Sequence, residues 1–149
     1  MFENLKKITD EIVKGLEKAK DEAIDNNLAT MADANVSRIE QGLNAEGQLL
    51  GRYKNPEYAQ FKKAIGSIAP LGVFDFKLEG DFLSGVFAKK NNKNIEFGSK
   101  DSKTKKLEAL AKDWGGDLFG LLDDQRKDIY EGQIIPEIID WINTKLQKI

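Results

Sequence analysis

The feature that most constrains the fold is a long amphipathic stripe at the start of the chain. From residue 2 to about residue 42, apolar side chains recur mostly every three or four residues, the spacing of one helical face. One helix over that range would be roughly 60 Å long at 1.5 Å per residue, longer than the core of a domain this size. Either the helix breaks near Asp25-Asn26-Asn27, or part of the stripe packs on another chain. The interface side chains expected are Phe2, Leu5, Ile8, Ile12 and Leu16.

A phenylalanine-rich segment in the middle of the chain predicts a small antiparallel sheet. Residues 73–78 alternate apolar with polar side chains, which is typical of a half-buried strand with Asp75 and Lys77 on its polar face. Residues 85–90 and 94–98 have the pattern of two strands joined by a turn at Asn91-Asn92. Four phenylalanines are expected to form the core of this sheet: Phe74, Phe76, Phe87 and Phe97.

Two shorter helices are expected on either side of the sheet. One covers residues 56–65 and has Pro56 in its first turn, where a missing N–H does no harm. The other covers residues 103–113 and is capped by Ser99 or Asp101.

The last helix begins near Asp123-Asp124, and Pro136 within it predicts a kink or a restart. The fold class that follows is α+β, with a long N-terminal amphipathic helix, a small antiparallel sheet and C-terminal helices packed on the sheet. We expect one domain overall, with a projecting helical arm of residues 1–35 and an α+β body of residues 36–149.

The absence of histidine and cysteine excludes most familiar catalytic centres. Ser-His and Cys-His nucleophile pairs, classical zinc sites and disulfides cannot be built without these residues. A cluster of carboxylates could hold a divalent cation, but it lacks the register of a calcium-binding loop and is better explained by helix caps and solvated helix ends. We expect no enzyme activity, no metal and no cofactor. The carboxylates in question are Asp113, Asp117, Asp123 and Asp124.

A lysine-rich segment over residues 89–106 offers a second candidate surface. It holds seven lysines against Glu96 and Asp101, and contains no arginine. Such a segment either contacts phosphate or forms a solvated edge that blocks unwanted strand pairing. The first possibility supports an alternative function, a cytosolic nucleic-acid-binding or regulatory module. The candidate basic edge comprises Lys89, Lys90, Lys93, Lys103, Lys105 and Lys106.

Nothing in the sequence predicts a membrane partner. No apolar run approaches the roughly 20 residues that span a bilayer, and the N-terminal segment alternates charged with apolar residues instead of forming a signal-peptide core. The polar face of the first helix mixes acids with lysines, which favours a partner helix over a lipid surface. Synthesis in a cytoplasm is therefore expected.

Three blocks of sequence, in order, resemble a known family. They are RIEQGLNAEGQLLGRYKNPEYAQFKK (38–63), FDFKLEGDFLSGVF (74–87) and SKDSKTKKLEALAKDWGGDLFGLLDDQRKDIYEGQIIPEIIDWI (99–142). Together they cover about two thirds of the chain. The set is similar to the virion morphogenesis or tail-completion (neck, head–tail connector) proteins of tailed bacteriophages, in the version common in phages of Bacteroidetes hosts.

The resemblance implies an α+β structural protein of the virion, made in the host cytoplasm and without catalytic activity. It implies a homo-oligomeric ring, hexameric or dodecameric, that joins head and tail during virion assembly. Other neck, portal or tail proteins are the implied partners, and contact with DNA in the lumen of the ring stays open. Gly47, Gly51 and Gly80 at turns, and Phe119 beside Gly120 in the core, have structural roles in this interpretation.

Overall fold

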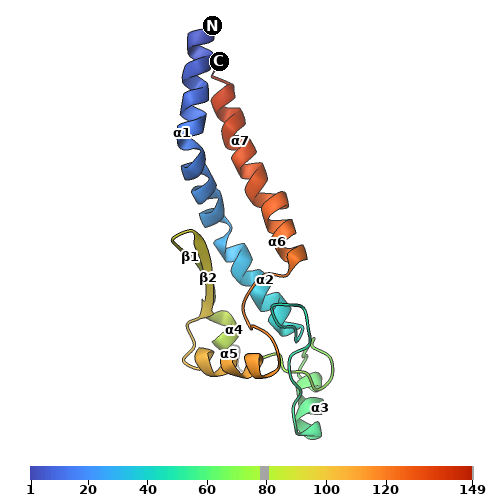
Figure 1. Ribbon diagram of the computed structural model, residues 1–149. Helices are drawn as coiled ribbons and strands as arrows, with labels where there is room; N and C mark the ends of the chain where they lie inside the picture. The colour runs from blue at the N-terminus through green and yellow to red at the C-terminus, as the bar shows by residue number, and fades with distance from the viewer. Residues whose placement is uncertain (78–80, 149) are drawn as a thin grey trace.

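The computed structural model describes residues 1–77 and 81–148, in which a helical arm rises from a small α+β body (Figure 1). Helix predominates over strand in these residues, and the α+β class expected from the sequence is confirmed. In chain order the elements are α1 (Phe2–Asn26), α2 (Leu28–Glu40), α3 (Pro56–Ala64), α4 (Asp81–Ser84), β1 (Val86–Asn91), β2 (Asn94–Ser99), α5 (Thr104–Asp113), α6 (Asp123–Ile129), the π-helical turn η1 (Tyr130–Ile134) and α7 (Ile135–Leu146).

The N-terminal stripe forms two helices that follow one another end to end (Figure 1). The break falls at Asn27, within the segment that the sequence offered as the place for a break, one of the two alternatives. The buried Asn27 amide donates to the Ala23 carbonyl oxygen at 2.8 Å and to the Glu137 carboxylate at 3.0 Å. These bonds hold the break against the C-terminal helices.

The C-terminal helices turn back along the first helix, so that α7 runs antiparallel to α1 and both ends of the chain lie at one end of the arm (Figure 1). The restart predicted at Pro136 is confirmed. Proline has no N–H to donate, and its ring presses on the carbonyl four residues back. The wider turn η1 comes just before α7, and Pro136 lies in the first turn of the restarted helix.

The sheet consists of two antiparallel strands, β1 and β2, paired from Val86 opposite Ser99 to Asn91 opposite Asn94. The turn falls one residue later than predicted, at Asn92-Lys93, and Asn92 takes the left-handed conformation with φ of 57°. Asparagine tolerates this conformation better than most residues.

The strand predicted over residues 73–78 is wrong in the part that the structure describes, because Val73 makes only an isolated bridge to Arg52. The backbone takes φ of 54° at Phe76, which breaks the alternation of a strand. Asp75, expected on a solvated face, is buried. Leu78 lies outside the described residues.

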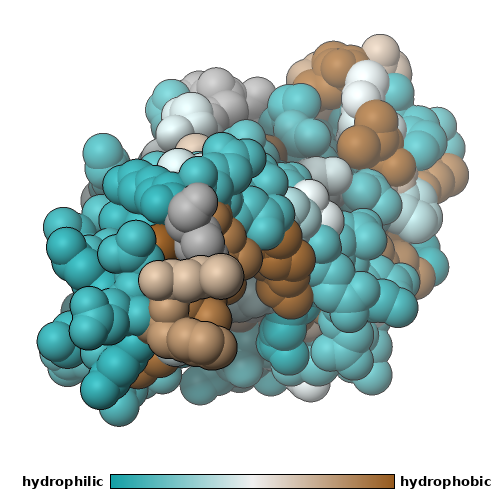
Figure 2. Space-filling view, turned by 90° about the horizontal axis from the view of Figure 1, so that it is seen from above, coloured by the Kyte–Doolittle hydropathy of each residue, from teal (hydrophilic) through white to brown (hydrophobic). Residues whose placement is uncertain are grey.

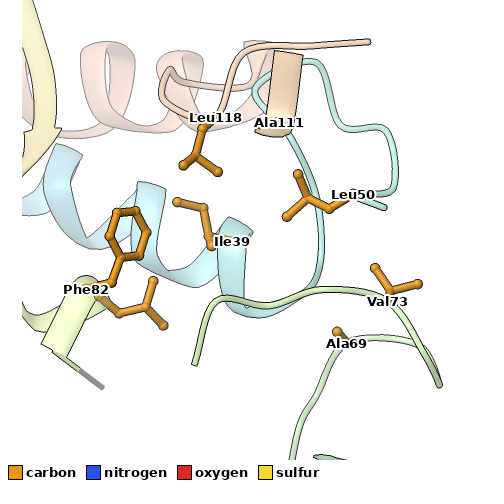
Figure 3. Close-up of a cluster of buried hydrophobic side chains, with 8 residues drawn as sticks. Ile39, Leu50, Ala69, Val73, Phe82, Ala111 and Leu118 are labelled. Carbon is orange, nitrogen blue, oxygen red and sulfur yellow. The ribbon is translucent and has the colours of Figure 1, made fainter. Parts of the chain in front are cut away.

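The first cluster of buried side chains joins α2 to the body, as Figure 3 shows. The second joins the arm to the sheet, because Ala88, Ile95 and Phe97 pack against a cluster that contains Ile129 and Ile134. The sheet therefore contacts the C-terminal helices where they begin, as expected. The first cluster comprises Ile39, Leu50, Ala69, Val73, Phe82, Leu83, Ala111 and Leu118.

The four phenylalanines assigned to one sheet core are divided, which corrects that expectation. Phe74 and Phe76 pack around Trp114, with ring centroids 4.8 Å and 6.3 Å from it. Phe97 belongs to the cluster at the base of the arm. The Phe87 ring covers Gly98 on the neighbouring strand, where an added Cβ would lie 2.9 Å from it.

Both short helices form where the sequence predicts them, but the side-chain cap expected for the second helix is absent. The Asn55 side chain accepts hydrogen bonds from the first turn of α3. Helix α5 starts after Lys103 without a side-chain cap. The Asp101 carboxylate instead accepts the Lys103 N–H at 2.8 Å in the preceding turn.

Candidate interaction surface

The inner seam of the arm is built from small side chains on α1. An added Cβ on Gly15 would lie 2.8 Å from Cζ2 of Trp141, so glycine lets the indole of α7 pack directly on the α1 backbone. Ala19 and Ala23 follow on the same face and are buried. The Lys145 ammonium lies 5.7 Å from the Trp141 ring centroid, close enough for a cation–π interaction.

Polar contacts fix the base of the arm. Asn26 and Asn27 both donate to the Glu137 carboxylate, at 3.2 Å and 3.0 Å. Lys90 on β1 pairs with Asp25 at 3.1 Å and lies 3.9 Å from Asp21, which ties the hairpin to α1. The arm is therefore held to the body by the second apolar cluster and by charge-assisted bonds.

A second apolar stripe runs along each helix of the arm and is open to solvent. The exposed fractions of its side chains lie between 38% and 84%. They leave on the order of 600 Å² of apolar surface uncovered, at the upper end of what a monomer usually exposes. We call this surface the arm face, and it consists of Phe2, Leu5, Val13 and Leu16 on α1 with Ile135, Ile139 and Leu146 on α7.

The two stripes lie on the same side of the helix pair. Successive residues of an α-helix are rotated by 100° about its axis. In that direction of rotation, the middle of each exposed stripe lies about a quarter turn beyond the residues of the inner seam on the same helix. Seen from the tip, successive residues turn clockwise along α1 and counterclockwise along the antiparallel α7. Both quarter turns therefore lead to the same side, and the arm face is one surface. Figure 2, a view down onto the arm, shows apolar atoms gathered near its end among hydrophilic ones.

The structure divides the five interface side chains expected from the sequence. Phe2, Leu5 and Leu16 are exposed on the arm face. Ile8 is 8% exposed, and Ile12 is half-buried; both lie on the side of α1 that carries Gly15. These two isoleucines belong to the chain's own helix pair, because the C-terminal helix returns along α1.

Four side chains of the arm face were not predicted as interface residues. Val13 interrupts the simple stripe, and no interface was predicted on the last helix. The spacing on that helix carried a signal, since residues 135, 139, 142 and 146 follow the four-three-four pattern of a second helical face. The missed residues are Val13, Ile135, Ile139 and Leu146.

The six lysines of the candidate basic edge fall into two groups rather than one surface. Lys89, Lys90 and Lys93 lie towards the turn of the hairpin, whereas Lys103, Lys105 and Lys106 lie at the start of α5, beyond its other end (Figure 1). Lys89 pairs with Glu96 at 3.7 Å, and Lys90 is held by Asp25.

A buried ion pair lies in the body, between α3 and the segment that follows it. Lys62 and Asp75 are both buried and 2.8 Å apart. The carboxylate also accepts from the Ser67 hydroxyl at 2.7 Å and from the Lys77 N–H at 3.0 Å. Burial alone would raise the pKa of Asp75, but these bonds and the Lys62 charge outweigh it and hold that pKa below its ordinary value. Burial, with the adjacent Asp75 charge, raises the pKa of Tyr53.

A buried arginine anchors the loop before α6 to α2. The Arg38 guanidinium donates to the carbonyl oxygens of Leu118, Gly120 and Leu43 at 2.8, 3.2 and 2.9 Å. It also donates to the Asn35 amide oxygen at 2.6 Å. Burial lowers the pKa of Arg38 to about 10, against the opposing effect of the Glu46 charge, so the group stays charged at neutral pH.

The described residues offer no arrangement of acidic side chains for a metal. Over residues 1–77 and 81–148, no three histidine, cysteine, aspartate or glutamate side chains come together as ligands. In the same residues, no helix combines the length and apolar character needed to cross a membrane. The buried charged groups described above hold loops and helices together.

No protein-family model, curated protein or solved structure matches this chain. The fold and the surface themselves define a class: a small α+β body that carries an antiparallel helical arm, with one side of the arm apolar and open.

The close contact at Gly15 gives a first prediction. Gly15→Gln should lower the free energy of unfolding by about 1–3 kcal/mol, because the new side chain must displace the Trp141 ring. Helix propensity alone predicts the opposite sign. The matched control is Gly132→Gln, since a Cβ at Gly132 meets nothing within 4 Å. Urea unfolding of both variants measures the difference, and equal changes would contradict the close-packed seam.

Proposed function

We propose that the protein is a structural subunit of a tailed-bacteriophage virion, a ring-forming neck or tail-completion protein that joins head and tail during assembly. The observation that carries the proposal is the arm face. An apolar surface of this size on a projecting pair of helices is typical of a protein–protein interface.

Two further points support the proposal. The three ordered blocks that resemble the neck proteins supply the phage context and the expectation of a ring of six or twelve copies. A sequence without histidine or cysteine suits a protein whose role is to bind other proteins. The subunit can stay soluble on its own and assemble on the growing particle, because contacts within an assembly form at high effective concentration.

The alternative, a nucleic-acid-binding module, has weaker support. Its lysines lie in two groups at opposite ends of the hairpin, and Lys90 is engaged with the arm. A phosphate backbone is gripped by a continuous basic surface, and such binding weakens steeply with salt.

The direct test is deletion of the gene from the phage, followed by electron microscopy of the lysate. The proposal predicts DNA-filled heads and separate tails, or tails of faulty length. Normal infectious particles from the deletion would refute it.

The second prediction concerns complementation of that deletion. A variant with Phe2→Gln, Val13→Gln and Ile139→Gln, which we call the arm-face variant, should lower the infectious titre by at least about 100-fold. It should stay folded, because these side chains are exposed in the isolated chain. Each of the three substitutions removes about 1 kcal/mol or more of stabilisation from apolar contact in an assembly.

The matched control carries Lys7→Gln, Lys14→Gln and Thr144→Gln, three exposed residues on the other sides of the same helices. It should complement like the natural sequence. Circular dichroism confirms that both variants are folded. Full complementation by the arm-face variant would show that the arm face has no part in assembly.

A further inference from the structure

A second apolar surface lies at the end of the molecule opposite the tip of the arm. Phe61 lies in the last turn of α3, Ile65 follows directly after the helix, and Ile68 and Leu71 lie in the loop beyond it. Their exposed fractions lie between 47% and 64%. Figure 1 places α3 at one extreme of the molecule and both chain ends at the other. We call these four residues the α3 patch.

The arm and the surroundings of the α3 patch carry net charges of opposite sign. The arm helices, residues 2–26 and 123–148, carry thirteen acidic and nine basic side chains. Around the α3 patch, Arg52, Lys54 and Lys63 stand against Glu57. The Arg52 guanidinium donates to the Leu71 carbonyl oxygen at 3.1 Å, which holds a positive charge beside the patch.

We infer that the arm face of one copy docks on the α3 patch of a second copy. The inference names the occupant of the arm face and rests on the proposal that this face is an assembly surface. Both surfaces are apolar, and a net acidic arm meets a net basic patch, a complementarity that favours one orientation in a protein interface. Pairing two arm faces would instead bring two net acidic arms together.

The pairing has a geometric consequence. Because the two surfaces differ and lie at opposite ends of the molecule, each copy keeps one free surface after docking. Copies then add head to tail, and the series either closes into a ring or runs on as a filament. A contact between identical surfaces would stop at a dimer.

Two variants that each lack one surface test this pairing. The first is the arm-face variant, and the second carries Phe61→Gln, Ile65→Gln and Ile68→Gln. Each alone should sediment as a monomer, because its remaining surface has no complement. Mixed in equal amounts they should form a one-to-one dimer, since each retains the surface that the other lacks. The natural sequence should form larger species as its concentration rises.

A charge variant provides an independent test of the pairing. Arg52→Glu with Lys54→Glu leaves the apolar residues of the α3 patch in place, and should weaken the mixed dimer about tenfold or more at low salt. Circular dichroism checks that every variant is folded before it is mixed.

Other outcomes overturn the inference without deciding the proposed function. If the variant that lacks the α3 patch still self-associates while the arm-face variant does not, the arm pairs with itself, and it remains an assembly surface. If the mixture stays monomeric, the two surfaces do not pair between copies. The gene deletion then decides the role in the phage separately.

Discussion

Lys62→Met should lower the free energy of unfolding by about 3–5 kcal/mol, because it leaves the buried Asp75 carboxylate without its cation. The Lys62 ammonium also donates to the Lys77 carbonyl oxygen, which would lose a partner as well. The measurement is urea unfolding at neutral pH followed by tryptophan fluorescence, since Trp114 packs beside Phe74 in the same body.

A matched control separates burial from charge. Lys77 pairs with Glu40 at 3.0 Å, but its side chain is largely exposed. Lys77→Met should therefore change the free energy of unfolding by no more than about 1 kcal/mol. The double variant Lys62→Met with Asp75→Leu should recover part of the loss, because no charge is left buried. Equal losses for the two lysine variants would contradict the buried-pair assignment.

The same ion pair makes the stability of the folded protein depend on pH in the acidic range. The pKa of Asp75 is held below its ordinary value of about 3.9 in the folded protein. Its contribution to stability is therefore complete above that ordinary value and is lost as the pH falls through the folded pKa. Lys62→Met removes the largest favourable contribution to the charged form, so the acid-sensitive part of the stability should shrink in that variant.

Arg38→Met should also lower the free energy of unfolding by about 3–5 kcal/mol. The guanidinium supplies donors to three backbone carbonyls, two of them in the loop before α6. Methionine fills a similar volume and leaves those carbonyls buried without partners. Hydrogen exchange gives a local readout, because the Gly120 N–H donates to Asn35, which is itself held by Arg38. Exchange at Gly120 should speed up along with the global loss.

Arg52→Met is the matched control. Arg52 is exposed. Within the described residues, its side chain donates one hydrogen bond, to the Leu71 carbonyl oxygen. The change should alter the free energy of unfolding by less than about 1 kcal/mol. A loss at Arg38 no larger than that at Arg52 would show that the loop does not depend on the buried guanidinium.

Local signals explain why most of the fold could be predicted from the sequence. The break near Asn27, the helix that begins at Pro56 and the restart at Pro136 each follow from backbone chemistry that one residue type dictates. The hairpin likewise follows from two alternating runs around an asparagine turn.

The errors arise where a long-range contact overrides a local pattern. The alternation around Asp75 predicted a strand with that carboxylate in solvent. In the structure, Lys62 approaches from α3, and the backbone at Phe76 leaves the strand conformation. No local pattern encodes a partner thirteen residues away on another element.

The candidate surface was predictable only in part, for the same reason. The N-terminal stripe identified the correct helix. The sequence pattern of a helix shows how wide its apolar face is, but it does not show which part of that face another helix covers. Gly15 marks the seam only once Trp141 is placed against it. Thus Ile8 and Ile12 were assigned outward, and Val13 and Ile139 were missed.

The most direct measurement is a cryo-electron microscopy reconstruction of the phage particle. We expect copies of this chain in a ring between head and tail, with Val13 and Ile139 of each copy covered by another protein chain. A particle whose head–tail joint lacks this chain, or a ring in which the arm face points into solvent, would contradict it.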